Sequence, residues 1–96
     1  MPSSEARVST PKAKNYMIQL CKHFGHKVPA EWTDSDAHVT FEIGTCDMVV
    51  EDDMLVLTCT ADDDLALHRV KAIVADHLVR FAWREELQLS WIASED

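Results

Sequence analysis

The 96-residue chain is 47% hydrophobic and 27% charged, an ordinary globular composition that excludes disordered, collagen-like and low-complexity proteins. Its length fits one α+β domain over residues 1–96. The net charge of −8 disfavours general affinity for nucleic acid or anionic membranes. Because the sequence shows neither a membrane-spanning apolar run nor a secretory leader, we expect a cytoplasmic protein.

The charges are unevenly distributed along the chain. Residues 1–27 contain five Lys or Arg and one acid, whereas residues 28–68 contain eleven acids and neither Lys nor Arg. This segregation predicts a folded domain with an acidic end and a locally basic end. Solubility alone is the alternative explanation.

The first elements are a strand and a helix. Alternation of apolar and polar residues predicts a short edge strand over residues 5–9. Thr10 and Pro11 are typical of the start of a helix. Gly25, in a left-handed conformation, and Pro29 are typical of its end. The three-and-four spacing of apolar residues predicts a buried stripe formed by Ala13, Tyr16, Met17, Leu20, Cys21 and Phe24.

Three strands follow as a meander. A two-residue turn at Gly44 and Thr45, with a positive φ at the glycine, and a second turn at Asp52 and Asp53 place apolar residues opposite one another. The first turn pairs Val39 with Val50, Phe41 with Met48 and Ile43 with Cys46. The second pairs Val50 with Leu55, Met48 with Leu57 and Cys46 with Cys59. Both turns therefore predict the same buried face.

A second helix and a last strand complete the chain. Thr60 is predicted to cap this helix, and Asp62, Asp63 and Asp64 place negative charge at its positive end. Its predicted stripe is Ala66, Val70, Ile73, Val74, His77, Leu78 and Phe81. Alternation predicts the last strand over residues 87–92. The sequence therefore predicts a β-α-β-β-β-α-β order and a two-layer α+β sandwich, with both helices on one face of a mainly antiparallel five-stranded sheet.

The sequence contains no familiar catalytic or metal-binding motif. Its cysteines have no C-x-x-C spacing, and two glycines are too few for a phosphate-binding loop. Cys46 and Cys59, as cross-strand neighbours, are close enough for a disulfide, but a reducing cytoplasm favours buried free thiols. We therefore assign no catalytic residue, metal ligand or cofactor, and favour a protein without enzymatic activity.

The end of the first helix is the first candidate binding element. Lys22, His23, His26 and Lys27 surround it. In one interpretation, these groups complement the negative end of the helix dipole. In the other, they form an anion or metal-chelate site, although two histidines are too few for zinc.

The second helix carries the other candidate element. His77 lies on the apolar stripe, either as a buried core residue or facing the first candidate, with Arg80 and Arg84 one and two turns further on. Arg80 can simply pair with Asp76, four residues earlier. Alternatively, the two arginines line a pocket for a carboxylate or a catecholate, which suits the planar guanidinium. The choice depends on whether the two helix ends are neighbours.

The uncovered face of the sheet offers a candidate interface. Val49 is predicted to lie opposite Val56, with Met54 on the same side and Ile92 joining from the last strand. Antiparallel sheets normally expose polar residues on such a face, so this small apolar patch indicates a homodimer or a docking surface for a partner such as a reductase. A monomer with a few exposed valines is the alternative.

The segments QLCKHFGHKVPAEW and VADHLVRFAWREELQLSW, together with SSEARVST and the acidic turn EDD, resemble the bacterial domain-of-unknown-function family 2218. The resemblance runs over almost the whole chain. It implies a small bacterial protein with a role near iron-siderophore handling, because similar domains occur beside siderophore-interacting flavin reductases. It implies no catalytic residues.

These observations favour an accessory domain that binds an anionic small molecule, such as a siderophore or its iron complex, through the histidine, lysine and arginine groups. The alternative is a protein-interaction module without a ligand, acting as a homodimer or docking on a reductase. A small enzyme that uses His77 as an acid or base has less support, because no nucleophile or orienting carboxylate lies at a useful spacing.

Overall fold

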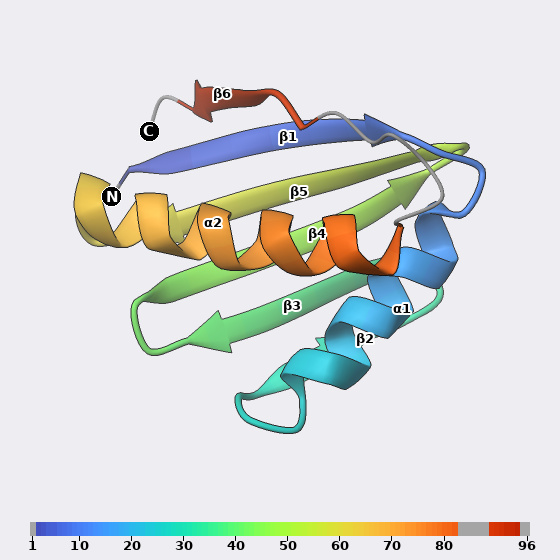
Figure 1. Cartoon of the computed structure of the whole chain (residues 1–96), viewed down its shortest axis with the longest axis horizontal. Coiled ribbons are helices and arrows are strands. Elements are labelled where there is room, and N and C mark those ends of the chain that lie inside the picture. Colours follow the sequence, from blue (N-terminus) through green and yellow to red (C-terminus); the bar gives the residue numbers. More distant parts are fainter. Residues whose placement is uncertain (1, 83–88, 95–96) are drawn as a thin grey trace.

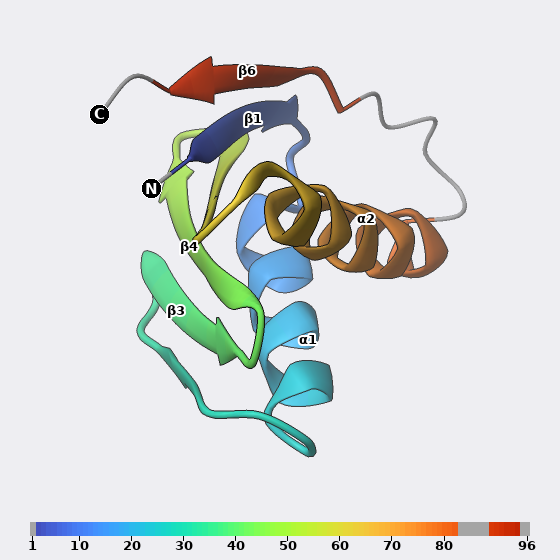
Figure 2. The ribbon, with the colours of Figure 1, turned by 90° about the vertical axis from the view of Figure 1, so that its left-hand side faces the viewer.

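The computed structural model describes residues 2–82 and 89–94, and shows an antiparallel sheet with two helices on one face (Figures 1 and 2). The elements are β1 (Ser3–Ser9), α1 (Ala13–Phe24), β2 (Ala30–Trp32), β3 (Asp36–Phe41), β4 (Gly44–Glu51), β5 (Met54–Ala61), α2 (Asp64–Phe81) and β6 (Trp91–Ser94). The strand order is β2-β3-β4-β5-β1-β6. The predicted α+β class and the placement of both helices on one face are confirmed.

The sheet has six strands in the described part of the chain rather than five. The additional strand, β2, is only three residues long, which is too short for alternation to reveal. β1 is not an edge strand as predicted, because it pairs with β5 on one side and with β6 on the other. β2 and β6 are the edges instead.

The two predicted hairpin registers have opposite outcomes. The β4–β5 register is confirmed, with Cys46 opposite Cys59 and Asp52 in the turn at a φ of 53°. The β3–β4 register is wrong, because the chain turns at residues 42–43 and Val39 therefore faces Cys46, four residues from the predicted partner. An even shift keeps the same side chains on the same face, so the buried face is as predicted.

Gly44 explains the wrong turn. Its φ is not positive, and it lies at the start of β4 rather than in the turn. A β-carbon there would lie 2.9 Å from Val70 Cγ2 on α2 and closer still to the Thr60 carbonyl oxygen. The glycine therefore permits close packing of β4 on β5 and α2, and has no role in turn geometry.

The helix ends differ from the predictions. α1 begins at Ala13, two residues after the predicted first position, and Gly25 ends it with right-handed angles (φ −61°) rather than left-handed ones. The cap of α2 is Asp63, whose carboxylate accepts a hydrogen bond from the Ala66 N–H at 2.7 Å, while Thr60 belongs to β5. Asp63 directly precedes the first helical residue, so its side chain reaches the free N–H groups of the first turn, which Thr60 does not.

The core lies between the helices and the covered face of the sheet. Every residue of the predicted α1 stripe is buried. On α2, Val70, Val74 and Leu78 are buried as predicted, together with Leu67, which the prediction missed. β6 begins at Trp91, so residues 89 and 90 of the predicted last strand do not belong to a strand, and residues 87 and 88 of that prediction lie outside the described residues.

Candidate functional site

The C-terminal turn of α1 lies against the C-terminal half of α2. The imidazole rings of His23 and His77 have centroids 4.7 Å apart, and His23 is 5.8 Å from the ring of Phe81. Phe24 contacts His77 at 5.0 Å and Phe41 of β3 at 5.1 Å, both edge to face. Two helix ends separated by about fifty residues in sequence therefore share one aromatic cluster.

A pocket of about 290 Å³ opens at this cluster, and its walls are mainly apolar. Phe24, Val28, Phe41 and Ile73 supply the apolar walls. The other lining residues are His23, Lys27 and His77. An apolar hollow with a few convergent polar groups is the usual form of a small-molecule site.

The orientation of His77 is fixed by its own helix. Nδ1 of His77 lies 2.7 Å from the carbonyl oxygen of Ile73, one turn earlier. Because a carbonyl only accepts, Nδ1 carries the proton and donates it. Nε2 of the neutral ring is then the nitrogen with a free lone pair, and it becomes a second donor if the ring is protonated.

His23 lies in a positively charged setting. Partial desolvation, followed by the positive charges of His77, Lys27, His26 and Arg80, lowers the pKa of His23 below its ordinary value of 6.5. The site is therefore electrostatically suited to an anion, which would relieve the mutual repulsion of these groups. A free metal cation is disfavoured by the same charges.

The remaining predicted site residues are placed around the pocket in different ways. Lys22 and His26 are exposed and do not line it. Arg80 forms a salt bridge with Asp76 at 3.3 Å, as expected for the simple helix pair, and still contributes positive potential at His23. Arg84 lies outside the described residues.

Sequence inspection missed part of the pocket wall. Val28 and Phe41 lie in the connection after α1 and at the end of β3, and neither belongs to a predicted helix stripe. Their apolar character was visible, but only the tertiary fold brings them beside α2.

The predicted apolar interface residues lie on the uncovered face, where β1 separates Ile92 from the others. Val49 is opposite Val56 as predicted, and the two are 39% and 7% exposed. Ile92 is 69% exposed and pairs with Glu5, in a different row of the sheet. Met54 pairs with Glu51 near the β4–β5 turn.

The cysteines are free and buried on the covered side. Burial raises the pKa of Cys21 to about 11. A hydrogen bond with Cys59, together with burial, raises the pKa of Cys46 well above its ordinary value. The thiols of Cys21 and Cys46 are therefore protonated at neutral pH and unsuited to nucleophilic chemistry. Among residues 2–82 and 89–94, no three His, Cys, Asp or Glu side chains are grouped to hold a metal ion.

The comparisons with known proteins give a family without a described activity. The family of uncharacterized proteins conserved in bacteria, DUF2218, matches residues 5–92. This chain belongs to the DUF2218 family. The solved NMR structure of PA4090 from Pseudomonas aeruginosa is similar at 33% identity and a TM-score of 0.81, over 96% of each chain. No curated protein matches, and neither helix in the described ranges has the length and hydropathy of a membrane span.

Proposed function

We propose that this DUF2218 protein binds a small organic anion with an aromatic or otherwise flat apolar body in the α1–α2 pocket, without transforming it. One observation carries the proposal: an apolar cavity is rimmed by His23, Lys27 and His77 in a chain whose net charge is −8. The apolar walls would hold the body of the ligand, and the rim would hold its anionic group.

The rim chemistry favours carboxylates and catecholates. Lys27 supplies a point charge, and Nε2 of His77 can accept a hydrogen bond from a phenol or, once protonated, donate one to an oxyanion. The edges and faces of Phe24 and Phe41 suit stacking against a ligand ring. None of the residues that line this pocket is a Ser, Cys, Asp or Glu, so the lining supplies neither a hydroxyl or thiol nucleophile nor a carboxylate to orient an imidazole, which favours binding over catalysis.

The volume limits what can enter. About 290 Å³ is at the lower end of the range for ligand pockets, so it accommodates about one substituted ring. A siderophore or its iron complex would therefore be held through one aromatic arm, with the remainder of the chelate outside. The implied association of the family with siderophore handling is consistent with this choice of ligand class.

Titration calorimetry with 2,3-dihydroxybenzoate, its ferric complex and a ferric hydroxamate tests the proposal. We expect the two aromatic ligands to bind, and Lys27→Gln and His77→Gln to weaken them by about tenfold each, through loss of a charged or hydrogen-bonding partner. Lys12→Gln is the matched control, because it removes the same charge from an exposed position at the start of α1. Absent heats with all three ligands, or equal affinities for the three variants, would refute the site.

A further inference from the structure

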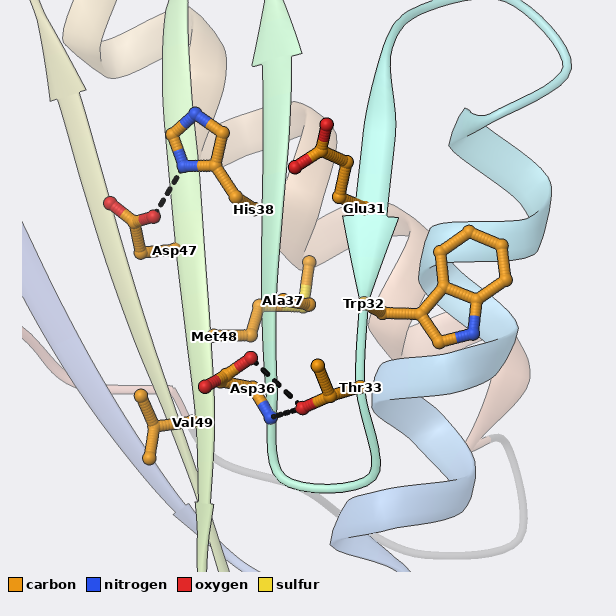
Figure 3. A pocket seen from close by; sticks show the side chains of 9 residues that line it. All are labelled: Glu31, Trp32, Thr33, Asp36, Ala37, His38, Asp47, Met48 and Val49. Atoms are coloured by element: carbon orange, nitrogen blue, oxygen red, sulfur yellow. Dashed lines mark hydrogen bonds and ion pairs between the residues drawn. The ribbon is translucent and has the colours of Figure 1, made fainter.

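Another hollow of the molecule, the β2–β4 hollow, lies on the uncovered face of the sheet, over β2, β3 and β4 (Figure 3). It has a volume of about 370 Å³. Its rim contains three carboxylates, from Glu31, Asp36 and Asp47, and no Lys or Arg. Neither helix covers this face (Figure 2). The hollow is therefore separate from the α1–α2 pocket in position and opposite to it in charge.

The carboxylates of the hollow lie in two rows. Glu31, His38 and Asp47 are opposite one another across β2, β3 and β4, and His38 is hydrogen-bonded to Asp47. Asp36 is two residues before His38 on β3, which places it about 7 Å further along the same face. Alternate side chains of an extended chain have the same spacing, so two of them could each face one row of carboxylates.

Charge balance distinguishes this part of the face from the other end of the sheet. On β1, Glu5 is neutralised by Arg7 at 3.0 Å. The carboxylate of Asp36 accepts a hydrogen bond from the neutral hydroxyl of Thr33 at 2.9 Å, and neither this carboxylate nor that of Glu31 forms an ion pair with a described residue. The negative charge at Glu31 and Asp36 is therefore not compensated by a Lys or Arg within the described chain.

The adjacent edge of the sheet is open to another strand. β2 is the terminal strand, with β3 on one side and none of the described strands on the other. Trp32 is 39% exposed and points away from β3, over the free side of β2 (Figure 3). An edge strand with unpaired backbone groups is a template for strand addition, and the indole can contact the side chains of an added strand that face away from Glu31.

We infer that β2 and this hollow together form a docking surface for an extended basic segment of a different protein, with Arg or Lys at alternate positions. The segment adds to the β2 edge and turns its cations toward Glu31 and Asp36. A second copy of the chain does not fit, because Arg7 is the only Lys or Arg in its described strands. The inference is independent of the proposed ligand pocket.

The test uses an eight-residue peptide with arginine at alternate positions and threonine between, and an isomer with the arginines contiguous. In ¹⁵N-labelled protein at 150 mM salt, we expect the alternating peptide to bind at least about fivefold more tightly and to shift amide signals of β2–β4. The double variant Glu31→Gln/Asp36→Asn should weaken it about tenfold. Glu42→Gln, a matched loss of exposed negative charge in the β3–β4 turn, should change it less than twofold.

Four outcomes would overturn the inference. Equal affinity for the two isomers, or signal shifts concentrated at Asp62, Asp63 and Asp64, would show general charge attraction. No binding of either peptide would remove the surface altogether. Light scattering that shows a dimer of the free protein, dissociated by Glu31→Gln/Asp36→Asn, would assign the surface to a second copy.

Discussion

The α1–α2 pocket and the β2–β4 hollow lie on opposite sides of the same sheet and have opposite chemistry. The α1–α2 pocket is mainly apolar and is rimmed by imidazoles and a lysine, whereas the β2–β4 hollow is rimmed by carboxylates. Their difference follows from the sequence, because α1 belongs to the basic segment 1–27 and β2, β3 and β4 to the segment 28–68 without Lys or Arg. Charge that is segregated along the chain is thus segregated across the sheet.

The same contrast applies to packing. The covered face holds the core, and the other face meets solvent, so neighbouring residues of one strand have very different surroundings. Leu57 is fully buried, and Thr58, which points to the opposite face, is half-buried. Substitutions on the two faces should therefore change the free energy of unfolding by different amounts.

The largest expected effect comes from truncation on the covered face. Leu57→Ala should lower the free energy of unfolding by about 2–5 kcal/mol, because it removes buried methyl groups and leaves a cavity. Thr58→Ala, one residue further and on the other face, should cost less than about 1 kcal/mol. Urea unfolding of both variants measures the difference. Similar losses for the two would contradict the assignment of a covered and an uncovered face.

A smaller loss is expected where β4 meets α2. Gly44→Ala should cost about 1–3 kcal/mol, since the added methyl group overlaps the Thr60 carbonyl and Val70. Thr45→Ala, the next residue of β4 and on the uncovered face, serves as the comparison. Urea unfolding measures both variants, and equally small losses for Gly44→Ala and Thr45→Ala would contradict the close approach of β4 to Thr60 and Val70.

The smallest effect concerns the charge of the α1–α2 pocket. His23 should titrate with a pKa below 6.5, and Lys27→Gln should raise that pKa toward 6.5, whereas Lys12→Gln should leave it unchanged. Because the folded state binds this proton less readily than the unfolded state, the contribution of His23 to stability is complete above pH 6.5 and declines as the pH falls below it. NMR titration of the imidazole signals measures this, and a pKa at or above 6.5 would contradict it.

The structure also shows why some sequence predictions succeed. The α1 stripe and the β4–β5 register are correct because each depends on a local period, and burial of one face enforces that period. The β3–β4 register was wrong because a glycine in a hairpin was interpreted as a turn residue. Its actual role, close approach to Val70, depends on a helix that follows later in the chain.

For the candidate sites as well, the sequence predicts some features, and others depend on the tertiary structure. Their charges are a property of the sequence, and the basic and acidic segments can be counted directly. The sequence does not predict the β2–β4 hollow, because β2 is too short to recognise from its residue pattern. Glu31 lies beside His38 only because β2 pairs with β3.

The sequence by itself determined the α+β class, the buried stripes and the segregation of charge, because these depend on residue type and on spacing within one element. Only the tertiary structure decided that His23 meets His77 and that Gly44 lies under α2. Such contacts join residues far apart in the chain, and their geometry is set by packing of whole elements, which no local period encodes.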